Sequence, residues 1–442
     1  MEEIKELLEN KNISKLRSLL DEMLEQDIAA AFEELTKEQM ILIFRLLSKD
    51  KAAETFTHME KHLQESLIHS MTDKELRETI NEMFTDDAVD IIEEMPSNIV
   101  KRILANISPA DRKIVNEFLN YPEDSAGSIM TNEFVDLKEN MTVEEAFQKI
   151  RKVGVDKETI YTCYVLDKSR KLLGLVSAKE LLLASPNAVI SDLMETNIVT
   201  ANTFDDQETV ARTLQKYDFL ALPVVDKENR LVGIVTVDDA IDVLQEEHTE
   251  DLQIMAAITP VDDTYFGTSV LNHAKHRILW LIILMISAAI TGGIITRYEE
   301  AFAAVPILVA FIPMLMGTGG NCGSQASTLI IRGLATEEIK PSEIFKVIFK
   351  EIRVSLVIGI TLAIVNGIRV IIQYKDYMLA VVLGIALICT VVVAKLLGCT
   401  LPVIAKKLKL DPAIMAAPII STIVDTLSVL IYFRVAMALM NI

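Results

Sequence analysis

The sequence predicts a multidomain protein: an all-α helical-repeat N domain, an α/β pair of repeats, a connecting helix and an all-α transmembrane domain of five helices. Its 442 residues exceed the length of one ordinary domain. Of the 43 basic and 63 acidic residues, 15 and 9 fall in residues 271–442, which leaves a net charge of −26 on residues 1–270. The chain therefore combines a very acidic part with a very apolar one.

The acidic part limits the kinds of partner. Binding to nucleic-acid phosphates needs an excess of Lys and Arg, so cations are expected and a nucleic-acid polymer is not. The four cysteines lack any Cys-x-x-Cys spacing, which predicts neither disulfides nor a zinc site. No Ser/His/Asp or Cys/His set indicates an enzyme. The acidic, amphipathic start MEEIKELLEN does not resemble a secretory signal, so the acidic part is expected in the cytoplasm.

Residues 1–127 show the periodicity of short helices. Residues 26–47, 51–71 and 87–107 resemble one another, and each contains two helical segments around a polar or proline-containing break. Such units are typical of helical-repeat solenoids, in which neighbouring repeats bury one another. We therefore expect a helical-repeat N domain over residues 1–127.

A different repeat occupies residues 128–245. Residues 164–182 and 223–244 are alike, since each has a β-rich run that ends in Asp-Lys, turns, re-enters a strand and starts a helix. This pattern is similar to a tandem pair of CBS domains, a regulatory module that often binds adenine nucleotides. The resemblance implies domains over about 128–190 and 191–245.

A polar connector over residues 246–272 favours a helix and precedes a transmembrane pore domain over residues 273–442. A hydrocarbon core of ~30 Å requires about 20 apolar residues in each spanning helix. Five stretches meet this requirement. They are 277–297, 302–331, 354–374, 377–401 and 412–440.

Basic residues orient these spans. Eleven Lys and Arg residues fall on one side of the predicted membrane and three on the other, and the positive side faces the cytoplasm. The N-terminus is therefore expected in the cytoplasm and the C-terminus outside. The eleven are Lys275, Arg277, Arg332, Lys340, Lys346, Lys350, Arg353, Lys395, Lys406, Lys407 and Lys409, and the three are Arg297, Arg369 and Lys375.

The second span is rich in glycine. Gly317, Gly319, Gly320 and Gly323 lie within seven residues and predict a broken helix. In a membrane, broken backbone is tolerated where it lines a wet cavity. Its carbonyls, together with Asn321 and Gln325, are therefore candidates for an ion path. The alternative is close packing of helices through small residues.

The fifth span carries a carboxylate, Asp425, about halfway along. A carboxylate at that depth costs at least a few kcal/mol and marks an ion pathway by default. Ser421 and Ser428 share its helix face, so this stripe is small and polar. The alternative is an ion pair with Lys395 or Arg434. Arg434 lies about 13 Å further along the same helix, too far to pair within one chain.

Acidic residues could also sense the ion. Two subunits around a pore would bring two Asp425 carboxylates together, which suits a hydrated divalent ion such as Mg²⁺, because Mg²⁺ is held by one or two carboxylates and keeps its waters. Charge alone does not exclude Ca²⁺ or Mn²⁺. Facing acidic domains repel one another unless cations lie between them. Mg²⁺ would then hold the cytosolic domains together, and low Mg²⁺ would let them move apart.

Motifs along the whole chain resemble the MgtE family of magnesium channels. These are GTGGNCGSQASTLIIRGLAT, DPAIMAAPIISTIVDTLSVLIYF and YPEDSAGSIMT, with the order of helical domain, CBS pair, connector and five spans. The resemblance implies a homodimer around a pore, hydrated Mg²⁺ at Asp425 and a connector that plugs the cytoplasmic mouth. It also implies closure by Mg²⁺ bound between the acidic domains.

The resemblance assigns roles to further residues by motif. The pore-lining candidates are Gly317, Gly320, Asn321 and Ser421. The candidate carboxylates for regulatory Mg²⁺ are Asp86, Asp90, Asp218, Asp239, Asp242, Glu247, Glu250, Asp251 and Asp411.

Three positions depart from the family pattern. Gly323-Ser324-Gln325 stands where the family has Gly-Asn-Gln, Ala417 replaces the Asn that often precedes the proline of the fifth span, and Ser428 stands in place of Gly. A pore lined by fewer amide side chains is expected to differ from the family in ion selectivity or conductance.

The second CBS repeat offers a nucleotide cleft. Residues 233–238 (GIVTVD) fit the CBS pattern in which a Thr or Ser and an Asp meet phosphate and ribose, whereas the first repeat has Lys179 in place of the Asp. One expectation is ATP at Phe219, Thr236 and Asp238. The other is an empty cleft.

Together these observations predict a homodimeric Mg²⁺-selective channel of the inner or plasma membrane that takes up magnesium and is closed by Mg²⁺. Influx down the membrane potential needs no ATP hydrolysis, because two charges gain roughly 4–5 kcal/mol per 100 mV. Two alternatives remain. One is an ion-coupled transporter of Mg²⁺ or other divalent cations, and the other is a membrane-anchored CBS nucleotide sensor.

Overall fold

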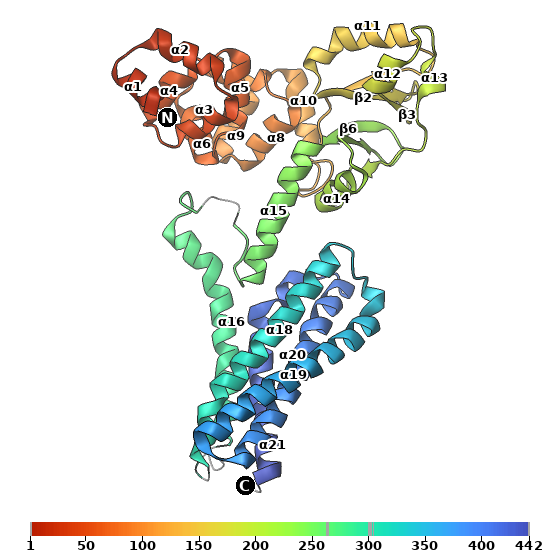
Figure 1. Ribbon diagram of the computed structural model, residues 1–442. Coiled ribbons are helices and arrows are strands. Elements are labelled where there is room, and N and C mark those ends of the chain that lie inside the picture. The colour runs from red at the N-terminus through yellow and green to blue at the C-terminus, as the bar shows by residue number, and fades with distance from the viewer. Residues whose placement is uncertain (1, 262–264, 299–302, 304, 441–442) are drawn as a thin grey trace. The chain divides into compact units, whose positions relative to one another are not determined.

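The computed structural model describes residues 2–261, 265–298, 303 and 305–440. Residues 262–264 of the predicted connector, and residues 302 and 304 of the predicted second span, lie outside the described residues. The chain divides into two compact units, Met1–Glu246 and Glu247–Ile442 (Figure 1). The first unit contains the N domain and the CBS pair, and the second contains the apolar helices.

Ten short helices form the N domain within the described residues, which confirms the predicted all-α domain. Side-chain caps define where several of them begin. The hydroxyls of Thr36 and Thr72 accept from the backbone N–H groups of Gln39 and Glu75, whose side chains bond back to the cap backbone. The helices are α1 (Glu2–Glu9), α2 (Ile13–Glu22), α3 (Glu25–Phe32), α4 (Lys37–Phe44), α5 (Lys49–Thr57), α6 (Lys61–Ser70), α7 (Asp73–Asn81), α8 (Thr85–Glu94), α9 (Ser97–Asn106) and α10 (Pro109–Phe118).

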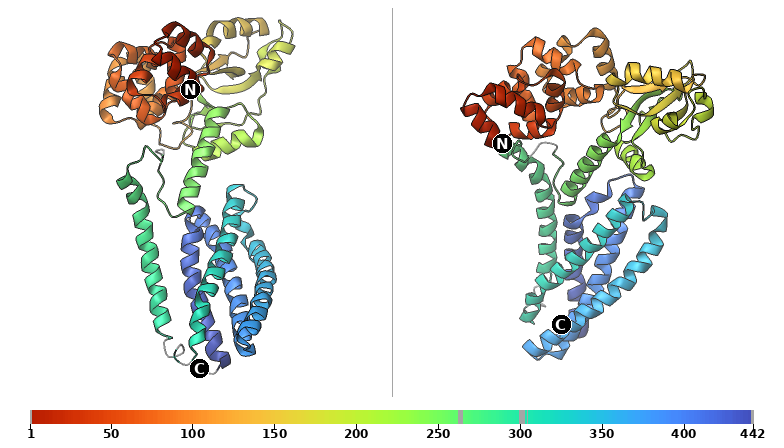
Figure 2. Two further views of the ribbon diagram at one scale, coloured as in Figure 1. Left: turned by 60° about the vertical axis from the view of Figure 1, so that its left-hand side comes forward. Right: turned by 45° about the horizontal axis from the view of Figure 1, so that its top comes forward.

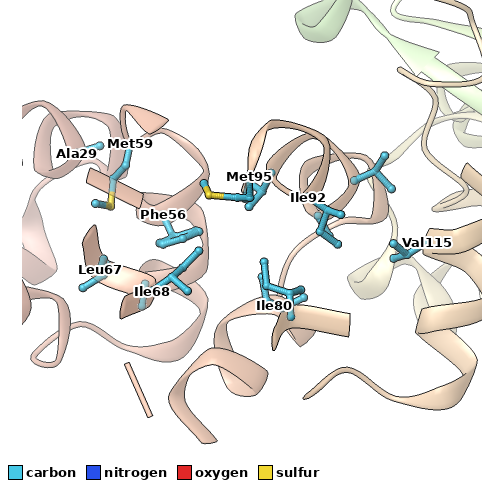
Figure 3. Close-up of a cluster of buried hydrophobic side chains, with 14 of the residues drawn as sticks. Ala29, Phe56, Met59, Leu67, Ile68, Ile80, Ile92, Met95 and Val115 are labelled. Carbon is cyan, nitrogen blue, oxygen red and sulfur yellow. The ribbon is translucent and has the colours of Figure 1, made fainter. Parts of the chain in front are cut away.

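The apolar faces of these helices meet in a shared core. Figure 3 shows Phe56, Ile68, Ile80 and Ile92, which come from the successive helices α5 to α8, and Met95 at the C-terminal end of α8; all are buried. Burial of one large apolar side chain stabilises a fold by about 1.5–3 kcal/mol. Each helix pair therefore gains its stability from its neighbours, as expected for stacked repeats.

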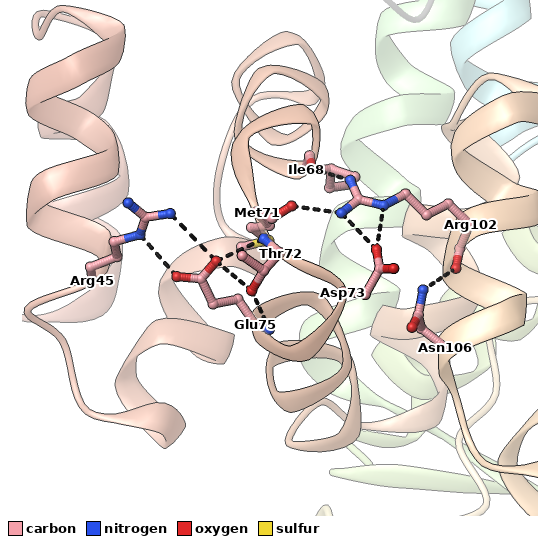
Figure 4. A network of polar contacts seen from close by, with 8 residues as sticks. All are labelled: Arg45, Ile68, Met71, Thr72, Asp73, Glu75, Arg102 and Asn106. Atoms are coloured by element: carbon pink, nitrogen blue, oxygen red, sulfur yellow. Dashed lines mark hydrogen bonds and ion pairs between the residues drawn. The ribbon is translucent and has the colours of Figure 1, made fainter.

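Polar contacts join helices that are distant in sequence (Figure 4). Arg45, the residue that follows α4, donates from its Nε to Glu75 Oε1 of α7 at 2.9 Å. Arg102 of α9 contacts Asp73 at 2.9 Å and donates to the carbonyl oxygen of Met71 at 2.6 Å. Because the last carbonyls of a helix lack partners within it, this arginine satisfies part of the C-terminal end of α6.

Two small three-stranded sheets of the same topology follow, which confirms the predicted α/β pair. In each, the first strand pairs in parallel with the second, and the second pairs antiparallel with the third. The Asp of each Asp-Lys motif closes the turn, because the carboxylates of Asp167 and Asp226 each accept two backbone N–H bonds.

The elements of the CBS pair repeat in the same order. The first set is β1 (Phe134–Leu137), α11 (Val143–Val153), η1 (Gly154–Asp156), β2 (Thr159–Leu166), β3 (Leu172–Ser177), α12 (Ala178–Leu183) and α13 (Ile190–Leu193). The second set is β4 (Ala201–Asn202), α14 (Gln207–Tyr217), β5 (Ala221–Val225), β6 (Leu231–Thr236) and α15 (Val237–Met255).

The helix α15 combines two predicted segments. It starts directly after β6 and continues to Met255, so it contains the end of the second CBS domain and the first part of the predicted connector. The described residues 256–261 and 265–269 are not helical. The next helix starts at Val270, where the Ser269 side chain provides the cap.

Among the described residues, five helices are long and apolar enough to cross a membrane, as predicted. They run lengthwise beside one another (Figures 1 and 2). The hydroxyls of Thr291 and Thr426 form a 2.6 Å hydrogen bond between the first and last of them. The elements are α16 (Val270–Thr296), η2 (Pro306–Phe311), α18 (Ile312–Ala335), η3 (Pro341–Glu343), α19 (Ile344–Tyr374), α20 (Tyr377–Lys407), η4 (Pro412–Met415) and α21 (Ala417–Met440).

Candidate functional site

Asp425 lies near the middle of α21, where this helix packs against α18. A Cβ added to Gly320 would lie 3.7 Å from Asp425 Oδ1 and 3.3 Å from Ser421 Oγ, so the carboxylate lies beside the α18 backbone. The Asp425 side chain is half-buried and has no hydrogen bond or ion pair with the described residues. Because an unpaired carboxylate is expensive in a membrane helix, this position favours water or a cation.

The predicted break in the second span is wrong, because α18 is one continuous helix. Its glycines instead let the neighbouring helices approach closely. A Cβ at Gly319 would lie 2.7–2.8 Å from side chains of α20 and α21, and a Cβ at Gly323 would lie 2.6 Å from Ile420. Close packing through small residues favours helix association in lipid and compensates for the low helix propensity of glycine.

The opposite face of α18 is polar and open. Four residues on this face recur at helical spacing, and all are exposed in the single chain. They are Gly317, Asn321, Gln325 and Thr328. Among the described residues, nothing lies within 4 Å of a Cβ added at Gly317. Amide side chains are poorly accommodated by lipid, so this face suits contact with water or with a second subunit.

Lys395 was counted among the basic residues that flank the spans, although it falls within the predicted span 377–401. It lies inside α20 with 3% of its surface exposed, and its Nζ is 3.6 Å from Glu351 Oε2 of α19. The count that orients the spans is therefore ten against three. The alternative of an ion pair between Lys395 and Asp425 is not found among the described residues, because a buried ammonium group needs a nearby carboxylate and Glu351 supplies it.

A second site lies in the first unit, where the N domain meets the CBS pair. Asp86 and Asp87 are in the first turn of α8, Glu158 precedes β2, and Asp239 is in the first turn of α15. We call these four residues the acidic cluster. The charge of Asp239 raises the pKa of each of the other three, so the four carboxylates are near enough to repel one another electrostatically.

Burial is the largest cause of the raised pKa values in the acidic cluster. It raises the pKa of Asp87 and Glu158 to about 7, that of Asp239 to about 6, and that of Asp86 well above its usual range. Oδ1 of Asp86 and Oε2 of Glu158 are buried without a hydrogen-bond partner among the described residues. Such oxygens are costly, and a cation between them would remove that cost.

The acidic cluster does not form a complete set of direct metal ligands. In the part of the chain that the structure describes, no three His, Cys, Asp or Glu side chains converge closely enough to hold a bare ion. A cation here would keep much of its water shell. Mg²⁺ fits this requirement, because it dehydrates reluctantly and is often held by one or two carboxylates through its waters.

Only two predicted sensor residues, Asp86 and Asp239, belong to the acidic cluster. Asp90 and Asp242 each lie one turn further along the same helices, and both are exposed. Asp218 is exposed at the end of α14, where it adopts a left-handed backbone conformation with a φ of 54°.

The remaining predicted sensor residues lie in the second unit. Glu247, Glu250 and Asp251 are on the C-terminal half of α15. Asp411 caps η4, where its Oδ1 accepts from the backbone N–H of Ala413 at 2.8 Å. Their proposed role in binding Mg²⁺ stays a prediction.

Sequence reasoning missed two members of the acidic cluster. Asp87 follows Asp86 directly, so a pair of acidic residues at a helix start was a usable signal. Glu158 lies in the loop before β2 and has no such signal. The backbone N–H of Glu158 donates to the carbonyl oxygen of Glu133 at 2.9 Å, and Thr85 Oγ1 of α8 donates to Glu133 Oε1 at 2.7 Å, so Glu133 links Glu158 to the start of α8.

The predicted nucleotide residues lie at one end of the second sheet. Phe219 is half-buried and stacks on Tyr217 with 5.3 Å between the ring centroids. Thr236 Oγ1 donates to Asp239 at 2.5 Å, whereas Asp238 is exposed. The predicted cleft therefore shares Asp239 with the acidic cluster.

Five membrane-length helices with an unpaired carboxylate, joined to an acidic unit with paired CBS-type sheets, are the features of a multi-pass cation transporter. Family models match in the same order. The divalent cation transporter model MgtE matches residues 312–435, the MgtE intracellular N domain matches 23–124, and the CBS domain matches 126–187 and 190–246. The chain belongs to the MgtE family.

Relatives match over nearly the full length. The magnesium transporter MgtE of Bacillus subtilis is 36% identical, with 98% of this chain and 96% of the relative covered. The magnesium transporter MgtE of Thermus thermophilus is 37% identical, with 99% of this chain and 98% of the relative covered. These relatives are named as transporters rather than enzymes.

A solved structure matches the soluble part. The cytosolic domain of the Mg²⁺ channel MgtE in complex with ATP is 38% identical and superimposes with a TM-score of 0.52. The match covers 54% of this chain and 98% of that one.

Proposed function

We propose that this protein is a Mg²⁺-selective channel that takes up magnesium and closes when Mg²⁺ binds to its cytosolic domains. The observation that carries this proposal is the unpaired carboxylate of Asp425 beside Gly320, on the same bundle as the open polar face of α18. The choice of Mg²⁺ is supported by the full-length relatives, which are named magnesium transporters.

The pore is proposed to form between two copies of the chain in the cell membrane. Gly317 and Asn321 would face the shared path from the open side of α18, while Gly320 and Ser421 position Asp425 at its edge. A path with amides and one carboxylate from each subunit suits a cation that keeps its waters. The ten-to-three count of basic residues supports a cytoplasmic N-terminus and an external C-terminus.

Closure is proposed to follow from charge neutralisation at the acidic cluster. Without a cation, the carboxylates of α8 repel those of the CBS pair across the junction. Mg²⁺ between them would hold the two domains together, and it would therefore select the closed state. The buried oxygens of Asp86 and Glu158 support this role, because they have no other partner among the described residues.

We expect the Mg²⁺-free protein to lose stability as the pH rises from about 4 to about 7. The pKa values of Asp87 and Asp239 are raised to about 7 and about 6, so the folded state binds more protons than the unfolded state up to that range, and folding weakens as these protons leave. One pKa unit corresponds to about 1.4 kcal/mol. Even one unit at each residue therefore amounts to about 3 kcal/mol.

Thermal unfolding of the full chain in detergent measures this effect. Millimolar Mg²⁺ should raise the unfolding midpoint by several degrees at about pH 8, where the carboxylates are charged, and by less at about pH 5. Equal Mg²⁺-induced shifts at the two pH values would contradict the assignment of the acidic cluster as the binding site.

A second candidate function is transport coupled to another ion. The buried Lys395–Glu351 pair favours it, because ionisable pairs inside membranes often take part in proton or ion pathways. The third candidate function is a membrane-anchored nucleotide sensor. It leaves the intramembrane carboxylate of Asp425 without a role.

Uptake of Mg²⁺ into proteoliposomes separates these functions. A channel should conduct under an inside-negative potential alone, and a coupled transporter should be silent until a proton or sodium gradient is added. A nucleotide sensor should bind ATP and pass no ion under either condition, an outcome that would overturn both transport proposals.

ATP is proposed as a ligand of the CBS pair, at Phe219, Thr236 and Asp238. The 38% identical cytosolic domain was solved in complex with ATP. The stacked rings of Phe219 and Tyr217 would suit a flat base. Because the carboxylate of Asp239 accepts a hydrogen bond from Thr236, the phosphates would approach this cleft with a bound cation.

A further inference from the structure

A separate cavity of about 240 Å³ lies entirely within the first CBS domain. It follows the edge strand β1 and is covered on one side by α11. Four cationic side chains line it, and its single carboxylate belongs to Asp136. The cavity contains none of the predicted nucleotide residues. The four cationic residues are Lys138, Lys149, Lys157 and Arg170.

The carboxylate inside the cavity is already neutralised. Lys149 Nζ lies 2.8 Å from Asp136 Oδ1, and Lys138 Nζ lies 3.7 Å from Asp136 Oδ2. These two lysines hold the pKa of Asp136 below its usual range despite its partial burial. Since one negative charge faces four positive charges, the cavity keeps an excess of three positive charges.

Two of the cations remain available to a ligand. The half-buried Lys157 side chain makes no hydrogen bond or ion pair with any described residue. Arg170 uses one guanidinium nitrogen on the carbonyl oxygen of Leu231 at 3.4 Å. Asn132 accepts from Thr85 through Oδ1, which leaves its amide N–H groups as donors at the wall of the cavity.

The positive charge is unusual for its surroundings. Residues 1–270 carry a net charge of −26, and a larger cavity in the N domain has each of its cations paired. There, Arg45 contacts Glu75 at 2.9 Å and Lys49 contacts Glu78 at 3.1 Å. Clustered cations without counter-charges repel one another, so an anion in the first CBS domain would relieve that repulsion.

We propose that this cavity binds a small phosphate-bearing anion with at least two negative charges. Arg and Lys are the residues that bind phosphate oxygens through charge-assisted hydrogen bonds. The volume lies below the roughly 300–1,000 Å³ of sites that enclose drug-sized ligands, which favours a diphosphate group over a whole nucleotide. The apolar floor contributed by Phe134 and Leu166 limits water around that group.

Calorimetric titration of the full-length protein in detergent with inorganic pyrophosphate tests the proposal. The buffer must be free of divalent cations, because pyrophosphate chelates them. Pyrophosphate should bind, and Lys157→Gln and Arg170→Gln should each weaken binding by at least about tenfold. Lys168→Gln removes an exposed lysine outside the cavity and serves as the matched control, since it should bind like wild type.

Parallel titrations with ATP and adenosine identify the source of the phosphate. If ATP binding falls in the same variants and adenosine binding does not, the occupant is the phosphate tail of a nucleotide. If only pyrophosphate binding falls, the occupant is an inorganic phosphate. Absence of pyrophosphate binding to wild type, or equal affinities in wild type, Lys157→Gln and Arg170→Gln, would overturn the proposal. Lys157→Arg should restore binding, which separates a lost charge from a misfolded domain.

Discussion

Asp425→Asn is expected to reduce Mg²⁺ flux through the reconstituted protein by roughly a hundredfold. The substitution keeps the side-chain size and removes the charge that a divalent ion would meet beside Gly320. A hydrogen bond to a charged group contributes about 1.5–3 kcal/mol, and the upper value corresponds to roughly a hundredfold in site occupancy. The measurement is the initial rate of Mg²⁺ entry into proteoliposomes under an inside-negative potential, followed with a Mg²⁺-sensitive dye.

Two further variants control this experiment. The first is Thr422→Ala. Thr422 lies one turn before Asp425 on α21, and among the described residues its hydroxyl donates only to the carbonyl oxygen of Ile419 on the same helix. This variant should conduct like wild type. Asp425→Glu keeps the charge and should retain a measurable part of the flux. Wild-type flux in Asp425→Asn would remove Asp425 from the ion path.

Asp239→Asn is expected to keep the channel open at internal Mg²⁺ concentrations that close the wild type. Asn keeps an oxygen that can accept from Thr236, so the start of α15 should stay intact. It removes one charged partner of the bound ion, which corresponds to at least about a tenfold rise in the closing concentration. Flux into proteoliposomes loaded with graded internal Mg²⁺ measures that concentration.

The matched control for this variant is Glu139→Gln, an exposed carboxylate of the first CBS domain outside the acidic cluster. It removes the same charge from the same unit and should leave the closing concentration unchanged. Closure of Asp239→Asn at the wild-type concentration would refute a sensor role. Closure at a lower concentration would mean that relief of repulsion outweighs the loss of a ligand, which also contradicts the proposed role.

Local features of the fold were predictable because short-range contacts produce them. The caps at Thr36 and Thr72 form within three residues of their partners. The Asp of each Asp-Lys motif satisfies backbone groups within its own turn. Apolar length alone predicts the membrane helices. Each of these signals is readable without knowledge of any distant residue.

The glycine-rich segment shows where such reasoning failed. The low helix propensity of glycine predicted a broken helix, yet α18 is continuous. Packing compensates for the low propensity, because Gly319 and Gly323 lie at helix contacts that only small residues permit. The error arose because propensity describes an isolated helix. The partner of Lys395 was not predictable for a related reason, since nothing near it in sequence indicates that Glu351 lies 3.6 Å away on another helix.

The sequence by itself determined the class of protein, the order of its domains, the five apolar helices and the carboxylate of Asp425 inside one of them. The apolar helices and the depth of Asp425 follow from composition and periodicity, whereas the class of protein and its CBS pair follow from motifs that resemble known families; all of these are properties of contiguous residues. Only the tertiary structure decided which carboxylates meet at the junction and which cations surround the cavity beside Asp136. Electrostatic energy depends on distance in space and on burial, and folding sets both for residues that are far apart in the chain.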